Sequence, residues 1–324
     1  MKVNEQSRDE YHKRISSAMD YIQLNIHKNL SLEIVAKAAH LSPFHFHKVF
    51  KQVVGETVAD YIRRIKLERA AGLFFYRKKL SVTEVAMELG FSSSQNLAKS
   101  FKRHFNLTPT GIKTLTSKEE LKSLIIQNRK IGNAQNKNGN AAASENVYAP
   151  VSIPNILETN MKTNALETES VQLIISDFSQ RLVIYKRLIG EYGTDVQAAF
   201  AQLHQFVTVR QLRTAEPIYI IWDNPEITPV DKCRTDIGIT LIEDIKEIAP
   251  YNTQIIPAGR YAYIRSVIKH NNEYEVVWEK LFKLILDGGY QLDDRPCFKL
   301  LHIENSDPQN GIFELSFCAA VRPL

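Results

Sequence analysis

Two different spacings of apolar residues divide the chain into a front part and a back part. Over residues 11–118 the apolar positions recur every three or four residues, with serine or threonine at the starts of the runs and few glycines. This spacing is typical of amphipathic helices that pack on one another. The front part is therefore predicted to be all-α, with one long helix over residues 57–76 that directs Tyr61, Ile65 and Leu73 inward.

The back part contains short apolar runs of the kind that form strands. Its first predicted strands lie at residues 171–175, 181–185, 217–222 and 236–241, with a helix at 195–212. A second set follows, with strands at 259–265, 297–303 and 311–317 and a helix at 273–287. The repeated order predicts an α+β fold of two pseudo-symmetric β-α-β-β repeats. A ligand cleft is expected where the two repeats join.

The segment between these parts has the composition of a linker. Residues 128–150 hold six asparagines, two glycines and an Ala-Ala-Ala-Ser stretch, so they cannot bury enough apolar area to offset chain entropy. We therefore expect a multi-domain protein with an all-α domain at residues 1–118, a linker at 119–165 and an α+β domain at 166–324.

Charge is distributed unevenly between the parts. The whole chain has a formal net charge of +5, but residues 1–118 hold 20 lysines and arginines against 10 aspartates and glutamates. The remaining residues hold 21 against 26. A basic domain joined to a mildly acidic one is typical of a protein whose basic part meets a polyanion such as nucleic acid.

Three cysteines, Cys233, Cys297 and Cys318, are odd in number and lack the spacing of a metal site, which favours buried thiols in a reducing cytosol. No uncharged apolar run approaches the roughly 18 residues that a membrane span needs. The N-terminus also lacks the apolar segment of an export signal. We expect a cytoplasmic protein that uses no metal or other cofactor and binds no membrane.

A duplicated unit lies within the front part. Residues 31–42 align with residues 81–92 at an offset of 50, and each copy has the pattern of a helix-turn-helix. The turn needs a residue that tolerates a left-handed backbone, which is His40 in the first copy and Gly90 in the second. The serines expected to cap the four helices are Ser31, Ser42, Ser81 and Ser92.

Three phrases of this part carry a family resemblance. Residues 41–50 (LSPFHFHKVF), 54–70 (VGETVADYIRRIKLERA) and 88–105 (ELGFSSSQNLAKSFKRHF) resemble the DNA-binding domain of the AraC/XylS family. The resemblance covers about a hundred residues. Two departures are Asn106, where the family usually has glycine, and residues 111–112, where an aromatic residue and arginine are usual.

The resemblance implies that the second helix of each unit enters a major groove of double-stranded DNA. The residues it directs toward base edges are Phe44, His47, Lys48, Ser94, Gln95 and Lys99. Those it directs toward phosphates are Lys51, Arg63, Arg64, Lys102 and Arg103. Two such helices about 34 Å apart would let one chain occupy successive major grooves of one site.

Four phrases of the back part resemble the GyrI-like small-molecule-binding domain, in the Rob-like arrangement behind an AraC-type domain. They are residues 221–237, 256–262, 278–282 and 294–299. Family members that bind cationic drugs carry a buried glutamate where this chain has Lys299, which argues against simple inheritance of cation binding. The candidate effector-pocket residues are Trp222, Asp236, Tyr261, Tyr263, Trp278, Glu279, Lys299 and Glu314.

The predicted function is that of a sequence-specific DNA-binding transcription regulator whose C-terminal domain senses a small-molecule effector. Two alternatives stay open for that domain: a protein-interaction scaffold that meets RNA polymerase or a second subunit, and a small-molecule hydrolase. The sequence contains no Ser-His-Asp elbow, metal-ligand cluster or glycine-rich phosphate loop. We therefore assign no catalytic residue and expect no enzyme.

Overall fold

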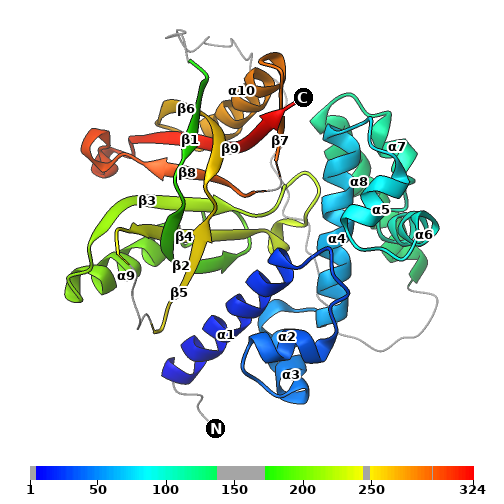
Figure 1. Cartoon of the computed structure of the whole chain (residues 1–324), viewed down its shortest axis with the longest axis horizontal. Coiled ribbons are helices and arrows are strands. Elements are labelled where there is room, and N and C mark those ends of the chain that lie inside the picture. Colours follow the sequence, from blue (N-terminus) through cyan, green and yellow to red (C-terminus); the bar gives the residue numbers. More distant parts are fainter. Residues whose placement is uncertain (1–4, 137–171, 244–248, 294) are drawn as a thin grey trace.

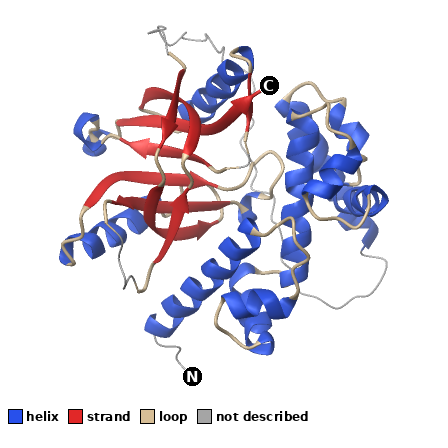
Figure 2. Ribbon diagram, viewed as in Figure 1, coloured by secondary structure: helices blue, strands red, loops and turns tan. Residues whose placement is uncertain are grey.

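The computed structural model describes residues 5–136, 172–243, 249–293 and 295–324. The helices of the front part lie beside the sheet of the back part, and α1 (Glu5–Leu24) runs along the boundary between them (Figure 1, Figure 2). The part of the predicted linker beyond residue 136 lies outside the described residues. Among the helices described, none has the length and apolar character needed to cross a membrane.

The front part contains two helix-turn-helix units joined by one long helix. The first unit consists of α2 (Leu32–Ala38) and α3 (Pro43–Val54), and the second of α5 (Val82–Glu88) and α6 (Ser94–Phe105). They lie toward opposite ends of α4 (Val58–Tyr76), as Figure 1 shows. The predicted long helix is therefore confirmed, and it holds the two units at a fixed separation.

Local signals define the ends of these helices. Ser31, Ser42 and Ser81 accept hydrogen bonds from backbone amides of the first turns, as predicted. The fourth cap is Ser93 rather than the predicted Ser92, because the helix begins one residue later in a run of three serines. His40 and Gly90 adopt the expected left-handed backbone, with φ of 53° and 65°.

Asn106, a departure from the family pattern, also has a left-handed backbone, with φ of 55°, and ends α6. Asparagine tolerates this conformation better than other residues with a side chain, so it replaces glycine here at low cost. The short α7 (Pro109–Lys113) follows, and its Ile112 is buried in the core of the second unit.

The front part extends further than the sequence indicated. Residues 118–136 were assigned to the linker from residue 119 onward, but they form α8 (Lys118–Asn136). Leu121 and Ile125 are four residues apart, and both are buried against the core of the second unit. This apolar pair holds α8 against the second unit, although the asparagine-rich composition predicts a linker here.

The described residues of the back part form one nine-stranded sheet in the order β1-β6-β9-β8-β3-β4-β2-β5, with β7 paired to β9. The strands are β1 (Ile174–Phe178), β2 (Arg181–Ile189), β3 (Thr214–Ile221), β4 (Arg234–Leu241), β5 (Asn252–Ile256), β6 (Gly259–Ile268), β7 (Tyr290–Leu292), β8 (Cys297–Leu301) and β9 (Phe313–Pro323). Two helices complete the fold, α9 (Val196–Val209) and α10 (Glu273–Asp287).

The predicted pair of β-α-β-β repeats is confirmed. The first repeat is β2-α9-β3-β4, and the second is β6-α10-β8-β9 with the short β7 added. The two edge strands are exchanged between the repeats. β1 precedes the first repeat in the chain but pairs with β6 of the second, and β5 precedes the second repeat but pairs with β2 of the first. Pairing of β3 with β8 joins the halves at the centre of the sheet. The sequence pattern missed β5 and β7.

Candidate nucleic-acid interface and ligand cavity

The second helix of each helix-turn-helix unit has a buried face and an exposed face. Phe46 and Phe50 of α3 are fully buried in the first unit, whereas Phe44 is 85% exposed. A large apolar side chain this exposed at the start of a helix is free to contact a partner. The spacing of the buried residues leaves the opposite face of each helix open to a ligand.

The residues predicted to meet base edges lie on these open faces. In α3 His47 and Lys48 are exposed beside Phe44, and in α6 Gln95 and Lys99 are exposed. Ser94 is only partly exposed. The structure thus places the predicted base-contact residues on corresponding faces of α3 and α6. Their contact with DNA stays a prediction.

Four of the five residues predicted to meet phosphates are exposed. They are Lys51, Arg63, Lys102 and Arg103, of which Arg63 forms an exposed ion pair with Asp60. The prediction for Arg64 is wrong. Arg64 is 7% exposed and pairs with Glu56 at 2.7 Å and with Glu68 at 3.0 Å.

The position of Arg64 in α4 explains its burial. It lies three residues after Tyr61 and four before Glu68, so the three side chains share one face of the helix. This face is covered by the back part, where Thr228 donates a hydrogen bond to Glu68 at 2.9 Å. Arg64 therefore has a structural role between the two parts of the chain.

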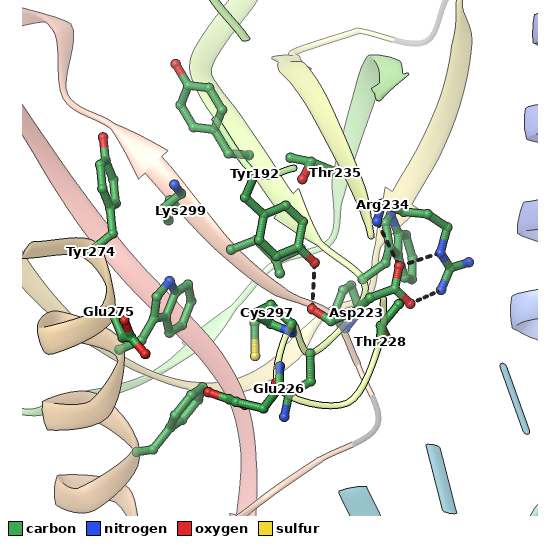
Figure 3. Close-up of a pocket in the computed structure, with 18 of the residues that line it drawn as sticks. Tyr192, Asp223, Glu226, Thr228, Arg234, Thr235, Tyr274, Glu275, Cys297 and Lys299 are labelled. Carbon is green, nitrogen blue, oxygen red and sulfur yellow. Dashed lines mark hydrogen bonds and ion pairs between the residues drawn. The ribbon is translucent and has the colours of Figure 1, made fainter. Parts of the chain in front are cut away.

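A cavity of about 2670 Å³ lies between the two parts. The front part contributes the C-terminal end of α4 and the start of α8, including Tyr76, Lys118 and Lys122. The back part contributes α9, α10, β8 and the loop between β3 and β4. Figure 3 shows the portion of the cavity around this loop, with Tyr274 and Lys299 projecting from α10 and β8.

Four of the eight predicted effector-pocket residues line this cavity: Trp222, Trp278, Glu279 and Lys299. The other four do not line it: Asp236, Tyr261, Tyr263 and Glu314. The alternation of side chains along each strand explains why the two tyrosines do not reach the cavity. Phe298 and Leu300 pack in one core with Tyr261 and Tyr263, so Lys299 between them points to the opposite face of β8.

The four excluded residues have partners of their own. Tyr261 donates to the Pro257 carbonyl at 3.0 Å, and Tyr263 packs near Phe178. Glu314 forms an ion pair with Arg265 at 2.8 Å. Asp236 is fully buried and accepts hydrogen bonds from three side chains, so its carboxylate is a structural anchor rather than a ligand anchor.

Asp236 connects the cavity to the front part. The indole Nε1 of Trp222 donates to Asp236 at 2.6 Å, and Arg187 donates to both oxygens of the same carboxylate at 2.7 Å. Arg187 also pairs with Asp20 of α1 at 2.7 Å. Burial raises the pKa of Asp20, and the nearby Arg187 opposes this effect.

A second network starts from the residue after Trp222. Asp223 binds the Arg234 guanidinium through two contacts of 2.7 Å, and Arg234 donates from Nη1 to the Tyr61 hydroxyl of α4 at 2.8 Å. Figure 3 shows the Asp223 and Arg234 pair beside the cavity. Both networks therefore link the loop that lines the cavity to helices of the helix-turn-helix part.

Several cavity residues were missed by the sequence analysis. Tyr219 and Tyr274 flank Lys299, whose Nζ lies 5.5 Å and 4.2 Å from their ring centroids. Burial lowers the pKa of Lys299 to about 8. Glu226, in the loop after β3, has a pKa raised by burial and opposed by Lys118. The phrase at residues 221–237 pointed to this loop, but cavity residues from α4 and α8 left no local signal.

The chain matches two protein families along its length. Residues 35–114 match the family described as a helix-turn-helix domain, and residues 172–317 match the family described as a GyrI-like small molecule binding domain. The described residues contain no group of three or more histidine, cysteine, aspartate or glutamate side chains suited to a metal ion.

Curated relatives match one part or the other. The HTH-type transcriptional activator AarP of Providencia stuartii is 31% identical over 96 residues, which are 30% of this chain and 70% of that protein. A DNA gyrase inhibitor of Citrobacter rodentium is 28% identical over 156 residues, 46% of this chain and 96% of that protein. The match to the uncharacterized HTH-type transcriptional regulator YbfP of Bacillus subtilis, 31% identical, spans 34% of this chain and only 38% of that protein.

These matches and the two helix-turn-helix units define a DNA-binding domain joined to a small-molecule-binding domain. The chain belongs to the AraC/XylS family of transcription regulators, and its back part is a GyrI-like domain.

Proposed function

We propose that this chain is a one-component transcription regulator whose affinity for its DNA site depends on a small molecule bound in the cavity. The observation that carries the proposal is that side chains from both parts of the chain line one cavity. A ligand bound where these walls meet contacts both parts, so it favours one arrangement of the front part relative to the back part over others.

The proposal assigns DNA recognition to the exposed faces of α3 and α6. Gln95 and Lys99 have donors and acceptors that suit adenine and guanine edges, and Phe44 can pack on a thymine methyl group. Exposed cations at the ends of these helices, such as Lys51 and Arg103, would neutralise phosphates and make binding salt-dependent. One chain would use both units on a single asymmetric site.

Trp222 gives the proposed ligand response a physical route. Its indole borders the cavity and lies near two buried guanidiniums, with the Arg187 and Arg234 Cζ atoms 5.6 Å and 6.0 Å from the ring centroid. A ligand that moves this ring disturbs the contacts of Arg187 with α1 and of Arg234 with α4. Both helices belong to the helix-turn-helix part.

Two experiments test the proposal. Selection from random duplex DNA with the full chain should enrich an asymmetric sequence that covers two successive major grooves; failure to enrich any sequence would contradict the DNA-binding assignment. Thermal-shift screening with lipophilic cations, anions and neutral compounds should find saturable stabilisation. Product formation would instead favour a hydrolase, and absence of any binding would favour a domain that contacts protein, such as RNA polymerase.

A further inference from the structure

Lys299 is a positive charge in the cavity without a counter-charge. Its Nζ lies over the rings of Tyr274 and Tyr219, and within the described part of the chain it makes no ion pair or hydrogen bond to a side chain or carbonyl. Burial is the cause of its lowered pKa, with no nearby carboxylate to oppose it. An ammonium group partly removed from water in this way gains from an added anion.

The carboxylates of the cavity are in a different situation. Glu226 is partly buried, but Lys118 and Lys122 of α8 both stabilise its charged form. Glu275 and Glu279 are exposed to solvent. These carboxylates therefore have protein cations or water close to them, although burial still raises the pKa of Glu226, whereas no carboxylate acts on Lys299.

The surroundings of Lys299 are aromatic and contain a second unused polar group. Trp278 stacks on Phe282 at 5.5 Å on the α10 side of the cavity. The hydroxyl of Thr235 is buried and has no hydrogen-bond partner among the residues described.

The strand register places Thr235 on the same face of the sheet as Lys299. Lys299 lies opposite Tyr219, and Thr235 lies opposite Ile221, two residues further along β3. Side chains two residues apart point to the same face, as do those directly opposite. The two backbone positions are two strand spacings apart across the sheet and two residues apart along it, a diagonal of about 12 Å, which a two-ring ligand with a polar group at each end can span.

From this arrangement we propose that the cavity binds a flat aromatic ligand that carries an anionic group, with the anion at Lys299. The inference rests on the proposed role of the cavity as the effector site and adds the charge of the effector. The aromatic walls stack on the rings of the ligand, Lys299 pairs with its carboxylate, sulfonate or phosphate group, and the Thr235 hydroxyl meets a polar group at the far end.

Three probes with one skeleton and different charges test this assignment: biphenyl-4-carboxylate, biphenyl-4-carboxamide and (biphenyl-4-yl)methylammonium. Their affinities for the full chain are measured by isothermal titration calorimetry. Both tryptophans of the chain, Trp222 and Trp278, line the cavity, so quenching of intrinsic fluorescence reports whether the probe binds there. The carboxylate is expected to bind at least about 10-fold more tightly than either other probe.

Variants locate the charge that is responsible. Lys299→Met should weaken binding of the carboxylate about 10-fold or more and leave that of the carboxamide within about twofold. Lys299→Arg retains the charge and should recover part of the affinity. The matched control is Lys283→Met, which removes an exposed lysine at the rim of the same cavity and should change nothing.

Proton uptake provides an independent readout. At pH 8 about half of the Lys299 side chains are neutral, so carboxylate binding should take up to about half a proton from the buffer, and this uptake should vanish in Lys299→Met. Equal or tighter binding of the ammonium probe, carboxylate binding that is insensitive to Lys299→Met, or no binding of any probe would each overturn the proposal. None of these results would affect selection of a DNA site by the full chain, which tests the proposed function separately.

Discussion

The indole nitrogen of Trp222 donates a 2.6 Å hydrogen bond to the buried carboxylate of Asp236, and this bond is the first of the contacts that connect a wall of the cavity to α1. Arg187 binds the same carboxylate and also Asp20 of α1, so three consecutive contacts lead from the cavity to the first helix. A tightly satisfied network of this kind resists small displacements, and Trp222 is its member that lines the cavity.

The ion pair between Asp20 and Arg187 should stabilise the association of the two parts. Asp20→Ala leaves a buried guanidinium with one carboxylate fewer, so the free energy of unfolding in urea should fall by about 2–3 kcal/mol, somewhat less than for a fully buried pair. Asp177→Ala is the control, because it removes an exposed partner of Arg260 and should cost below about 0.5 kcal/mol. Equal effects of the two substitutions would contradict the role given to Asp20.

Arg64 and Arg103 should have opposite phenotypes although both are arginines of the basic part. Arg64→Met leaves Glu68 buried without its cation and should lower the free energy of unfolding by about 3 kcal/mol. Arg103→Ala should leave stability unchanged and reduce the slope of log affinity for DNA against log salt by about 1. Urea unfolding and DNA titrations at several salt concentrations measure both quantities. A stable Arg64→Met variant with a reduced salt slope would restore the phosphate role that its burial excludes.

Gln95 and Lys99 should determine sequence preference at one half of the DNA site. Each alanine variant should cost about 1–3 kcal/mol at the bases it contacts and leave the other half-site unchanged. His47→Ala should produce the corresponding loss at the opposite half, whereas Lys102→Ala should weaken binding to all sequences alike. Competition titrations with single-base substitutions distinguish these patterns, and an unchanged preference in Gln95→Ala and Lys99→Ala would remove the base-contact assignment.

Lys299 should make stability depend on pH in an unusual window. Its pKa is about 8 in the folded chain against an ordinary value of 10.5, so between these values the unfolded chain holds more protons than the folded chain. The free energy of unfolding of the native chain should therefore rise with pH in this window, relative to Lys299→Met, by about 2 kcal/mol in total. Urea unfolding of both proteins at pH 7.5 and pH 10 measures the difference. A relative stability that does not change, or that falls, would show that folding does not lower the pKa of Lys299.

Features fixed by local chemistry could be predicted from the sequence. The serine caps at Ser31, Ser42 and Ser81 and the left-handed turns at His40 and Gly90 depend on neighbouring residues alone. The cap of α6 is Ser93 and not the predicted Ser92, because any of three adjacent serines can cap the helix almost equally well. These signals, together with the alternation of helical and strand patterns, were enough for the fold of both parts.

Features that depend on contacts between distant segments could not be predicted in this way. α8 is held by burial of Leu121 and Ile125 against the second helix-turn-helix unit, which its composition does not reveal. Arg64 belongs by spacing to the inward face of α4, but its positive charge suggested DNA instead. Four of the predicted effector-pocket residues do not line the cavity, among them Asp236 and Tyr261, which point to the other face of the sheet. The front part supplies cavity residues that only the tertiary fold brings near.

The most direct test of the DNA-reading role is the affinity of the full chain for its selected duplex compared with a shuffled duplex of the same length and composition. Fluorescence anisotropy at moderate salt should show binding to the selected duplex at least about 1,000-fold tighter, as expected for two helices that each read a major groove. Affinities within about threefold of each other would contradict sequence-specific recognition by the paired helix-turn-helix units.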